Sequence, residues 1–226
     1  MQKLMQIENV EKFWQQPIGW YIDEKLKISI FYPESSSLYQ LLHSDQESEH
    51  HINQILKNEP LSTFIRIKYE IAFQLSRILL TLHNLSSVKH HGHITSHNVF
   101  VNLKKIGSGT FSVNVKVADL ELQDFMEYSN MFFSYRLASV WSAPESLKML
   151  KKMPEFTQAL DTYSFGMILW ELWHIAVPFD NDINLACQYV LQEEARPKII
   201  QSEKDQESDS DGEAEEKEFK PKLTVR

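Results

Sequence analysis

The sequence predicts an α+β fold that is mainly helical and contains two short β-hairpins. Two apolar stretches, residues 64–82 and 161–173, have the length and composition of buried helices. Two pairs of short alternating segments, within residues 18–31 and 99–117, flank turn-forming residues and favour hairpins. A chain of 226 residues is long enough for one such domain with a sizeable core.

The first sixty residues are expected to hold one hairpin and one short helix. Residues 18–22 and 26–31 are predicted to be its strands, separated by Asp23-Glu-Lys. Residues 38–42 follow a proline and three serines and favour a short helix. Residues 43–60 are polar and predict a loop, in which His50-His51 is expected to be solvated.

The strongest helix signal follows Pro60. Its apolar residues recur at three- and four-residue spacing, which predicts one buried face: Phe64, Ile67, Ile71, Leu75, Ile78, Leu79 and Leu82. The second hairpin turns at Gly107-Ser-Gly109, where we expect glycine to supply positive φ. Residues 161–173 are almost hydrophobic all round, which predicts a central helix, and residues 185–191 favour another.

Charge and composition exclude several classes of protein. Residues 202–218 hold nine acids against two lysines, so this stretch carries seven of the eight net negative charges. It is expected to be disordered, and no basic footprint for nucleic acid is present. No apolar run reaches the ~18 residues of a membrane span, and no signal peptide is recognisable. The single Cys187 is expected to pack in a helix, which fits a reducing, cytoplasmic setting.

Three separated segments carry a resemblance to protein kinases. Residues 91–101, His-Gly-His-Ile-Thr-Ser-His-Asn-Val-Phe-Val, resemble the kinase catalytic loop, His-Arg-Asp-Leu-Lys-x-x-Asn, and the strand after it. Residues 116–122 resemble the metal-binding Asp-Phe-Gly segment, and Trp141-Ser-Ala-Pro-Glu145 resembles the Ala-Pro-Glu that closes the activation segment. The order and spacing of the three segments make a chance match very improbable. The residues of these motifs most resemble those of the tyrosine-kinase-like group.

The resemblance implies a domain organisation. Residues 1–32 are interpreted as a remnant of the kinase N-lobe, with the end of a helix and two strands. Residues 33–200 are interpreted as the helical C-lobe, and residues 201–226 as an acidic tail. No Val-Ala-Ile-Lys-like strand occurs in the chain. Ile106-Gly-Ser-Gly-Thr-Phe is similar to a phosphate-binding loop, but its position just before Asp119 favours a hairpin turn.

The resemblance also shows where catalytic residues have changed. His93 stands at the place of the catalytic Asp, which positions the substrate hydroxyl and accepts its proton in the family. Gly92 replaces the loop Arg, and Thr95 replaces the Lys that contacts the transferring phosphate. A histidine can act as a base, but here it would replace an anion. His90, His91, His93 and His97 cluster in sequence, yet a metal site is not expected from them.

Two residues of the family's Mg²⁺–ATP site are kept. The resemblance implies that Asn98 and Asp119 could ligate Mg²⁺, so weak ATP binding through the metal stays open. The alternative is that Asn98 braces the loop and that Asp119 caps a turn. Glu121 stands where the family has Gly, and a second carboxylate there would crowd Asp119.

Two further residues are assigned structural roles. Asp161 is the polar opening of an apolar helix and could be its N-cap, whereas the resemblance implies that it bonds the catalytic-loop backbone. Glu145 pairs in the family with an Arg in later helices. Here an acidic tail follows instead, so Glu145 is expected to lack a buried partner unless Arg196 substitutes. The helix at 161–173 is then expected to leave an exposed apolar patch.

Three functions follow from this resemblance. The first is a catalytically impaired pseudokinase, a binding or scaffolding module in signalling that meets protein partners through its lobe surface and acidic tail. The second is an ATP-dependent Ser/Thr or Tyr protein kinase whose N-lobe lies outside this sequence. The third is a truncated product without stable function.

Overall fold

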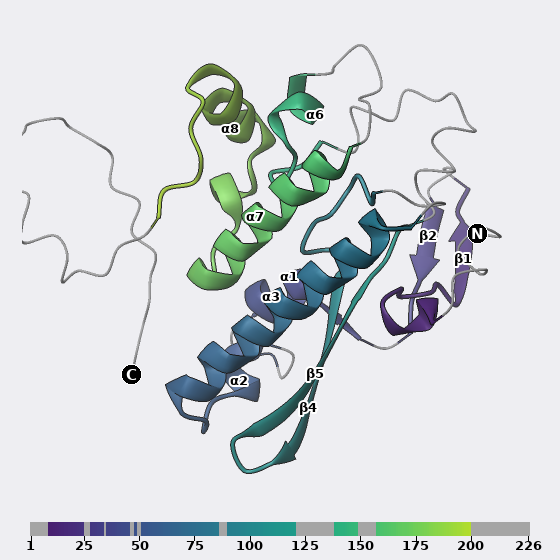
Figure 1. Ribbon diagram of the computed structural model, residues 1–226, viewed down its shortest axis with the longest axis vertical. Coiled ribbons are helices and arrows are strands. Elements are labelled where there is room, and N and C mark those ends of the chain that lie inside the picture. The colour runs from purple at the N-terminus through teal and green to yellow at the C-terminus, as the bar shows by residue number, and fades with distance from the viewer. Residues whose placement is uncertain are drawn as a thin grey trace, which may run out of the picture.

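The computed structural model describes residues 9–24, 28–33, 35–45, 48, 51–85, 90–120, 138–148 and 157–199. The acidic tail and Glu121 lie outside these residues. Two helices, α3 (Leu61–His83) and α7 (Gln158–His174), lie side by side, and a long β-hairpin packs along α3 (Figure 1). The predicted α+β fold, dominated by helices, is confirmed.

The remaining helical elements are short. They are α1 (Leu38–His43), α2 (Ile52–Ile55), α6 (Pro144–Lys148), α8 (Ile183–Cys187), 3₁₀-helices at Val10–Lys12 and Pro178–Asn181, and a π-helical turn at Gln188–Gln192. The predicted helices at 38–42 and 185–191 are confirmed in α1 and in α8 with its π-helical continuation. Cys187 is a half-buried member of α8. No helix in the described part of the chain has the length and apolarity to cross a bilayer.

Both predicted hairpins form. β1 (Gly19–Ile22) pairs antiparallel with β2 (Ile28–Phe31) in a two-stranded sheet. β3 (Ser36–Ser37), β4 (Val99–Gly107) and β5 (Thr110–Val117) form a second sheet in the order β3-β4-β5. Gly109 has φ 62°, a conformation that glycine adopts without steric cost, and this accounts for the tight turn between β4 and β5.

The apolar stripe of α3 enters the core as its spacing predicts. Six of its seven members are buried, and Phe64 packs at the edge of the core. Each fully buried Leu or Ile contributes about 1.5–3 kcal/mol relative to exposure. Met167, Ile168 and Leu172 of α7 are buried in the same hydrophobic cluster as this stripe. The helix pair also supports the loop at residues 91–98, through hydrogen bonds from the loop backbone to Asp161 on α7.

The segment after α1 differs from the sequence expectation. It contains α2, and His51 is only 2% exposed instead of solvated. The Nδ1 atom of His51 accepts the Asn53 N–H as an N-cap at 3.0 Å, and its Nε2 donates to the Leu42 carbonyl at 3.1 Å. Both ring nitrogens are thus satisfied by backbone, which permits burial. Burial in turn lowers the pKa of His51.

Candidate active site

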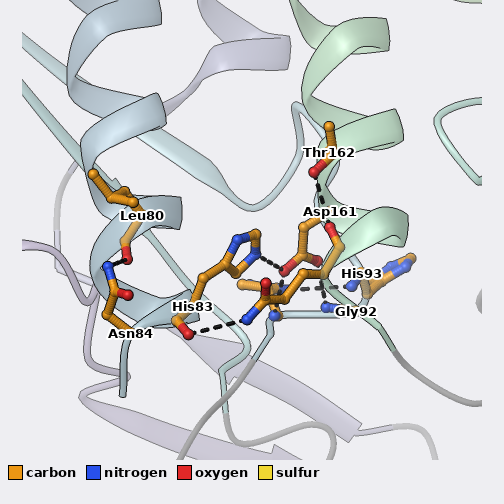
Figure 2. A network of polar contacts seen from close by, with 9 residues as sticks. Leu80, His83, Asn84, Gly92, His93, Asp161 and Thr162 are labelled. Carbon is orange, nitrogen blue, oxygen red and sulfur yellow. Dashed lines mark hydrogen bonds and ion pairs between the residues drawn. The ribbon is translucent and has the colours of Figure 1, made fainter.

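The loop of residues 91–98 is held by a carboxylate from another helix. Asp161 on α7 is fully buried, and it accepts the backbone N–H groups of His91 and Gly92, each at 2.7 Å (Figure 2). It also accepts a hydrogen bond from Nε2 of His83, at the end of α3, at 2.9 Å. The N-cap interpretation of Asp161 is wrong. The N-cap of α7 is Thr157, and Asp161 lies within the first turns of the helix. The contact with the loop backbone, which the resemblance implies, is present.

The backbone at Gly92 explains why glycine suits this position. Gly92 has φ 80°, in the left-handed region that residues with a Cβ enter only at a cost. Its N–H points at Asp161, so the turn and the hydrogen bond are formed together. The glycine that replaces the family's Arg therefore relieves backbone strain while removing a cation.

A second anchor ties the loop to the end of β5. His91 is 2% exposed; its Nε2 donates to the Ala118 carbonyl at 2.7 Å, and its Nδ1 accepts the His93 N–H at 3.3 Å. The Ala118 N–H in turn donates to the Asn98 carbonyl at 2.9 Å. The loop is thus fixed at both ends against the strand that leads to Asp119.

His93, at the place of the catalytic Asp, lies in a strongly desolvated position. Its pKa is lowered to about 4, mainly by burial, with the neighbouring His91 and His97 acting in the same direction and Asp119 opposing the shift. His93 is therefore neutral at physiological pH. A base with so low a pKa has little driving force for taking a proton from a substrate hydroxyl.

Asn98 is engaged by the loop itself. Its Oδ1 accepts the Thr95 N–H at 2.9 Å, and its Nδ2 donates to the His93 carbonyl at 2.6 Å. The alternative in which Asn98 braces the loop therefore describes this structure. Thr95 is only 4% exposed. Because threonine is uncharged, it supplies no cation at the position where the family's Lys contacts the transferring phosphate.

Asp119 is engaged from the opposite side of the site. It follows β5 with φ 62°, and its Oδ1 accepts a 2.5 Å hydrogen bond from the Tyr32 hydroxyl. Tyr32 follows β2, and its ring lies 5.2 Å from that of Phe100 on β4. The tyrosine thus links the first hairpin to Asp119. Sequence reasoning did not identify Tyr32, because a contact between residues 87 positions apart has no local pattern.

A metal ion does not fit this donor set as the side chains lie here. Asn98 and Asp119 supply the amide and carboxylate oxygens that Mg²⁺ prefers. However, Tyr32 donates to the carboxylate and the loop backbone engages the amide at both ends. Within the described ranges, no group of three or more His, Cys, Asp or Glu side chains is placed to hold a metal.

A buried carboxylate below the loop was also not anticipated. Glu171 on α7 is fully buried and accepts hydrogen bonds from Nε2 of His43 at 2.8 Å and from Nε1 of Trp141 at 2.6 Å. His97 from the loop stacks on Tyr39, with ring centroids 4.0 Å apart, and its edge meets Trp141. The available signal was a second carboxylate, besides Asp161, inside an apolar helix, because a buried carboxylate must find partners.

Glu145 lies apart from this group. Among the described residues no cation forms a salt bridge with Glu145, and its side chain is exposed. Arg196 lies over the ring of Tyr163, 5.0 Å from its centroid, and donates to the carbonyls of Glu194 and Ala195. The expectation that Glu145 is a buried charge without a partner is therefore wrong, because water solvates its carboxylate.

Comparison with known proteins places the chain in a family. The model of the protein tyrosine and serine/threonine kinase family matches residues 2–207. The chain belongs to this family. It is similar to the serine/threonine/tyrosine-protein kinase HT1 of Arabidopsis thaliana, with 32% identity over 142 residues, which are 61% of this chain and 32% of that protein.

Two other relatives differ in kind. A dual specificity protein kinase, pyk3 of Dictyostelium discoideum, is 27% identical over 149 residues, which cover 66% of this chain and 9% of that protein. A receptor-type guanylate cyclase, gcy-28 of Caenorhabditis elegans, is 30% identical over 125 residues, or 54% of this chain and 9% of that protein. The chain thus matches about a third or less of the length of these relatives.

Proposed function

We propose that this kinase-family chain is a catalytically impaired domain that acts as a binding or scaffolding module in signalling. The observation that carries the proposal is that both retained metal-ligand side chains are engaged by the protein itself. Asn98 bonds the loop backbone, and Asp119 accepts the Tyr32 hydroxyl. Mg²⁺–ATP would have to displace the tyrosine before it could use the carboxylate.

The electrostatics of the loop support the same proposal. Phosphoryl transfer depends mainly on positioning and on stabilising charge around the phosphates. Here the residue at the base position is a neutral imidazole with a pKa of about 4, and Thr95 offers no positive charge. His93→Asp alone is therefore not expected to restore activity. A relative that carries the name of a guanylate cyclase is consistent with kinase-like sequence serving another role.

A second candidate is an ATP-dependent Ser/Thr or Tyr protein kinase completed by an N-lobe outside this sequence. It is favoured by the presence of Asn98 and Asp119 at the family's metal-ligand positions, and by a loop whose backbone is held firmly by Asp161. Under the first proposal, protein partners meet the lobe surface and the acidic tail in the cytoplasm. Under the second, they are phosphorylation substrates.

A paired assay tests the first candidate by asking whether this chain by itself transfers phosphate. The purified chain is incubated with radiolabelled ATP and Mg²⁺ or Mn²⁺, with generic protein substrates, beside the Asp119→Asn variant. We expect no incorporation above that variant. Incorporation that Asp119→Asn abolishes would refute the proposal.

Nucleotide binding is tested separately by thermal shift with ATP, with and without Mg²⁺. Wild type is expected to shift little. Tyr32→Phe removes the hydroxyl that occupies Asp119 and keeps the ring against Phe100, so any metal-dependent shift should increase in this variant. A large shift of wild type without metal would contradict this account of the site.

A further inference from the structure

An apolar groove runs between α3 and α7 on the side of the helix pair that the β-hairpin does not cover. Its volume is about 730 Å³, and aromatic side chains from both helices form its walls. On α3, Tyr69 and Phe73 are 61% and 56% exposed, and on α7 Trp173 is 42% exposed. The expected apolar patch on α7 is thus present, and α3 extends it.

The lining of this groove selects for an apolar occupant. Among the described residues that line it, none is Asp, Glu, Lys or Arg. A charged segment would lose its hydration there without gaining an ion partner among these lining residues. Contiguous apolar surface of this kind is usually covered by a partner or by another part of the same chain.

The chain itself runs to the edge of the groove. Nε1 of Trp170 donates to the Lys198 carbonyl at 2.9 Å, and Ile199 contributes to the lining while remaining 76% exposed. Twenty-seven residues of the sequence follow Ile199. They therefore start at the groove.

Those residues contain one segment with a suitable pattern. After the acidic stretch at 202–218, the sequence reads Phe219-Lys-Pro-Lys-Leu-Thr-Val-Arg226. Successive side chains of an extended chain point to opposite faces. Phe219, Pro221, Leu223 and Val225 would share one apolar face, and the two lysines, the threonine and the arginine would share the other. Pro221 opposes a helix and suits an extended conformation.

We propose that residues 219–226 bind in the groove between α3 and α7 as an extended segment, with this apolar face against the aromatic side chains. The basic residues of the opposite face then remain in water. Nineteen residues lie between Ile199 and Phe219. A chain of that length can span at most about 65 Å when fully extended, so the linker is long enough for the segment to return to the groove. Tethering supplies an effective concentration of about millimolar, so a weak contact suffices.

Disulfide trapping in the full chain tests the placement. In a Cys187→Ser background, Leu223→Cys is combined with Ser76→Cys, which lines the groove on α3. The matched control pairs it with Ser62→Cys, a more exposed position on the same helix, outside the groove. We expect an intramolecular disulfide to form at least about tenfold faster with residue 76 than with residue 62, because docking raises the local concentration. Equal rates, or disulfides formed only between two chains, would overturn the proposal and, in the second case, assign the groove to a second copy.

A pair of charge substitutions provides an independent readout. Leu223→Asp and Thr224→Asp each add one negative charge to neighbouring residues on opposite faces of the segment. Leu223→Asp is expected to increase amide exchange at residues 69–76 of α3 and to raise binding of a hydrophobic dye severalfold, whereas Thr224→Asp should leave both at the wild-type level. The proposal fails if the two variants behave alike.

Discussion

Replacing Asp161 by alanine should strongly destabilise the chain, because this residue of α7 holds the backbone of the loop at residues 91–98. The carboxylate accepts three hydrogen bonds, from two backbone N–H groups and from His83, and it is fully buried. Hydrogen bonds to a charged acceptor contribute about 1.5–3 kcal/mol each, and unsatisfied buried donors cost more than the loss of a bond in water. Allowing for non-additivity, we expect a loss of about 3–5 kcal/mol, a large part of the ~5–15 kcal/mol that stabilises a domain.

The assay is urea unfolding followed by far-UV circular dichroism, with the slope of the transition compared between variants. Asp182→Ala is the matched control. Asp182 caps α8 by accepting the N–H groups of Asn184 and Leu185, but it is exposed, so its loss should cost about 1 kcal/mol. Asp161→Asn should be intermediate, since an amide keeps one acceptor oxygen. If Asp161→Ala cost no more than Asp182→Ala, the buried carboxylate would not hold the loop as described.

Two further predictions concern charge. His93 has a pKa of about 4 in the folded chain and an ordinary value of 6.5, so the unfolded state binds more protons between these values and stability falls as pH drops from about 6.5 to about 4. His93→Asn should flatten this part of the dependence of the urea midpoint on pH, and an unchanged slope would show that His93 is not desolvated. Glu145→Gln should change the free energy of unfolding by less than about 0.5 kcal/mol, because Glu145 is exposed and in no salt bridge within the described residues. A loss of several kcal/mol in urea titration would mean that Glu145 has a buried cationic partner.

The parts of the fold that the sequence predicted correctly are those marked by a pattern among residues close together in the chain. The three- and four-residue spacing on α3 and the alternation on β4 and β5 are repeated over many residues, so burial of one face fixes the element. The predicted turn is confirmed at Gly109, where the backbone has the positive φ that glycine adopts most easily. The resemblance to kinases correctly placed the loop between α3 and β4, and it gave the contact between Asp161 and the loop.

The parts that did not follow depend on contacts across the fold. His51 is buried because two backbone groups happen to meet both of its ring nitrogens, and histidine is not among the usual N-cap residues. Tyr32 contacts Asp119 from another sheet, so no local sequence pattern around either residue predicts the contact. Glu171 was recognisable as an anomaly in an apolar helix, but its partners His43 and Trp141 lie on separate elements.

Most of the hydrogen bonds that shape the catalytic-loop segment involve its backbone. Asp161 accepts from two loop N–H groups, His91 accepts a third and donates to a carbonyl beyond the loop, and Asn98 bridges an N–H and a carbonyl. None of these bonds uses the side chains at the three positions that depart from the family's pattern. The side chains at positions 93 and 95 can therefore change without breaking these bonds, whereas position 92 favours glycine because of its φ of 80°. The hydrogen-bonded loop in this chain is accordingly an indication of retained architecture, and activity must be judged from the side chains at positions 93, 95 and 119.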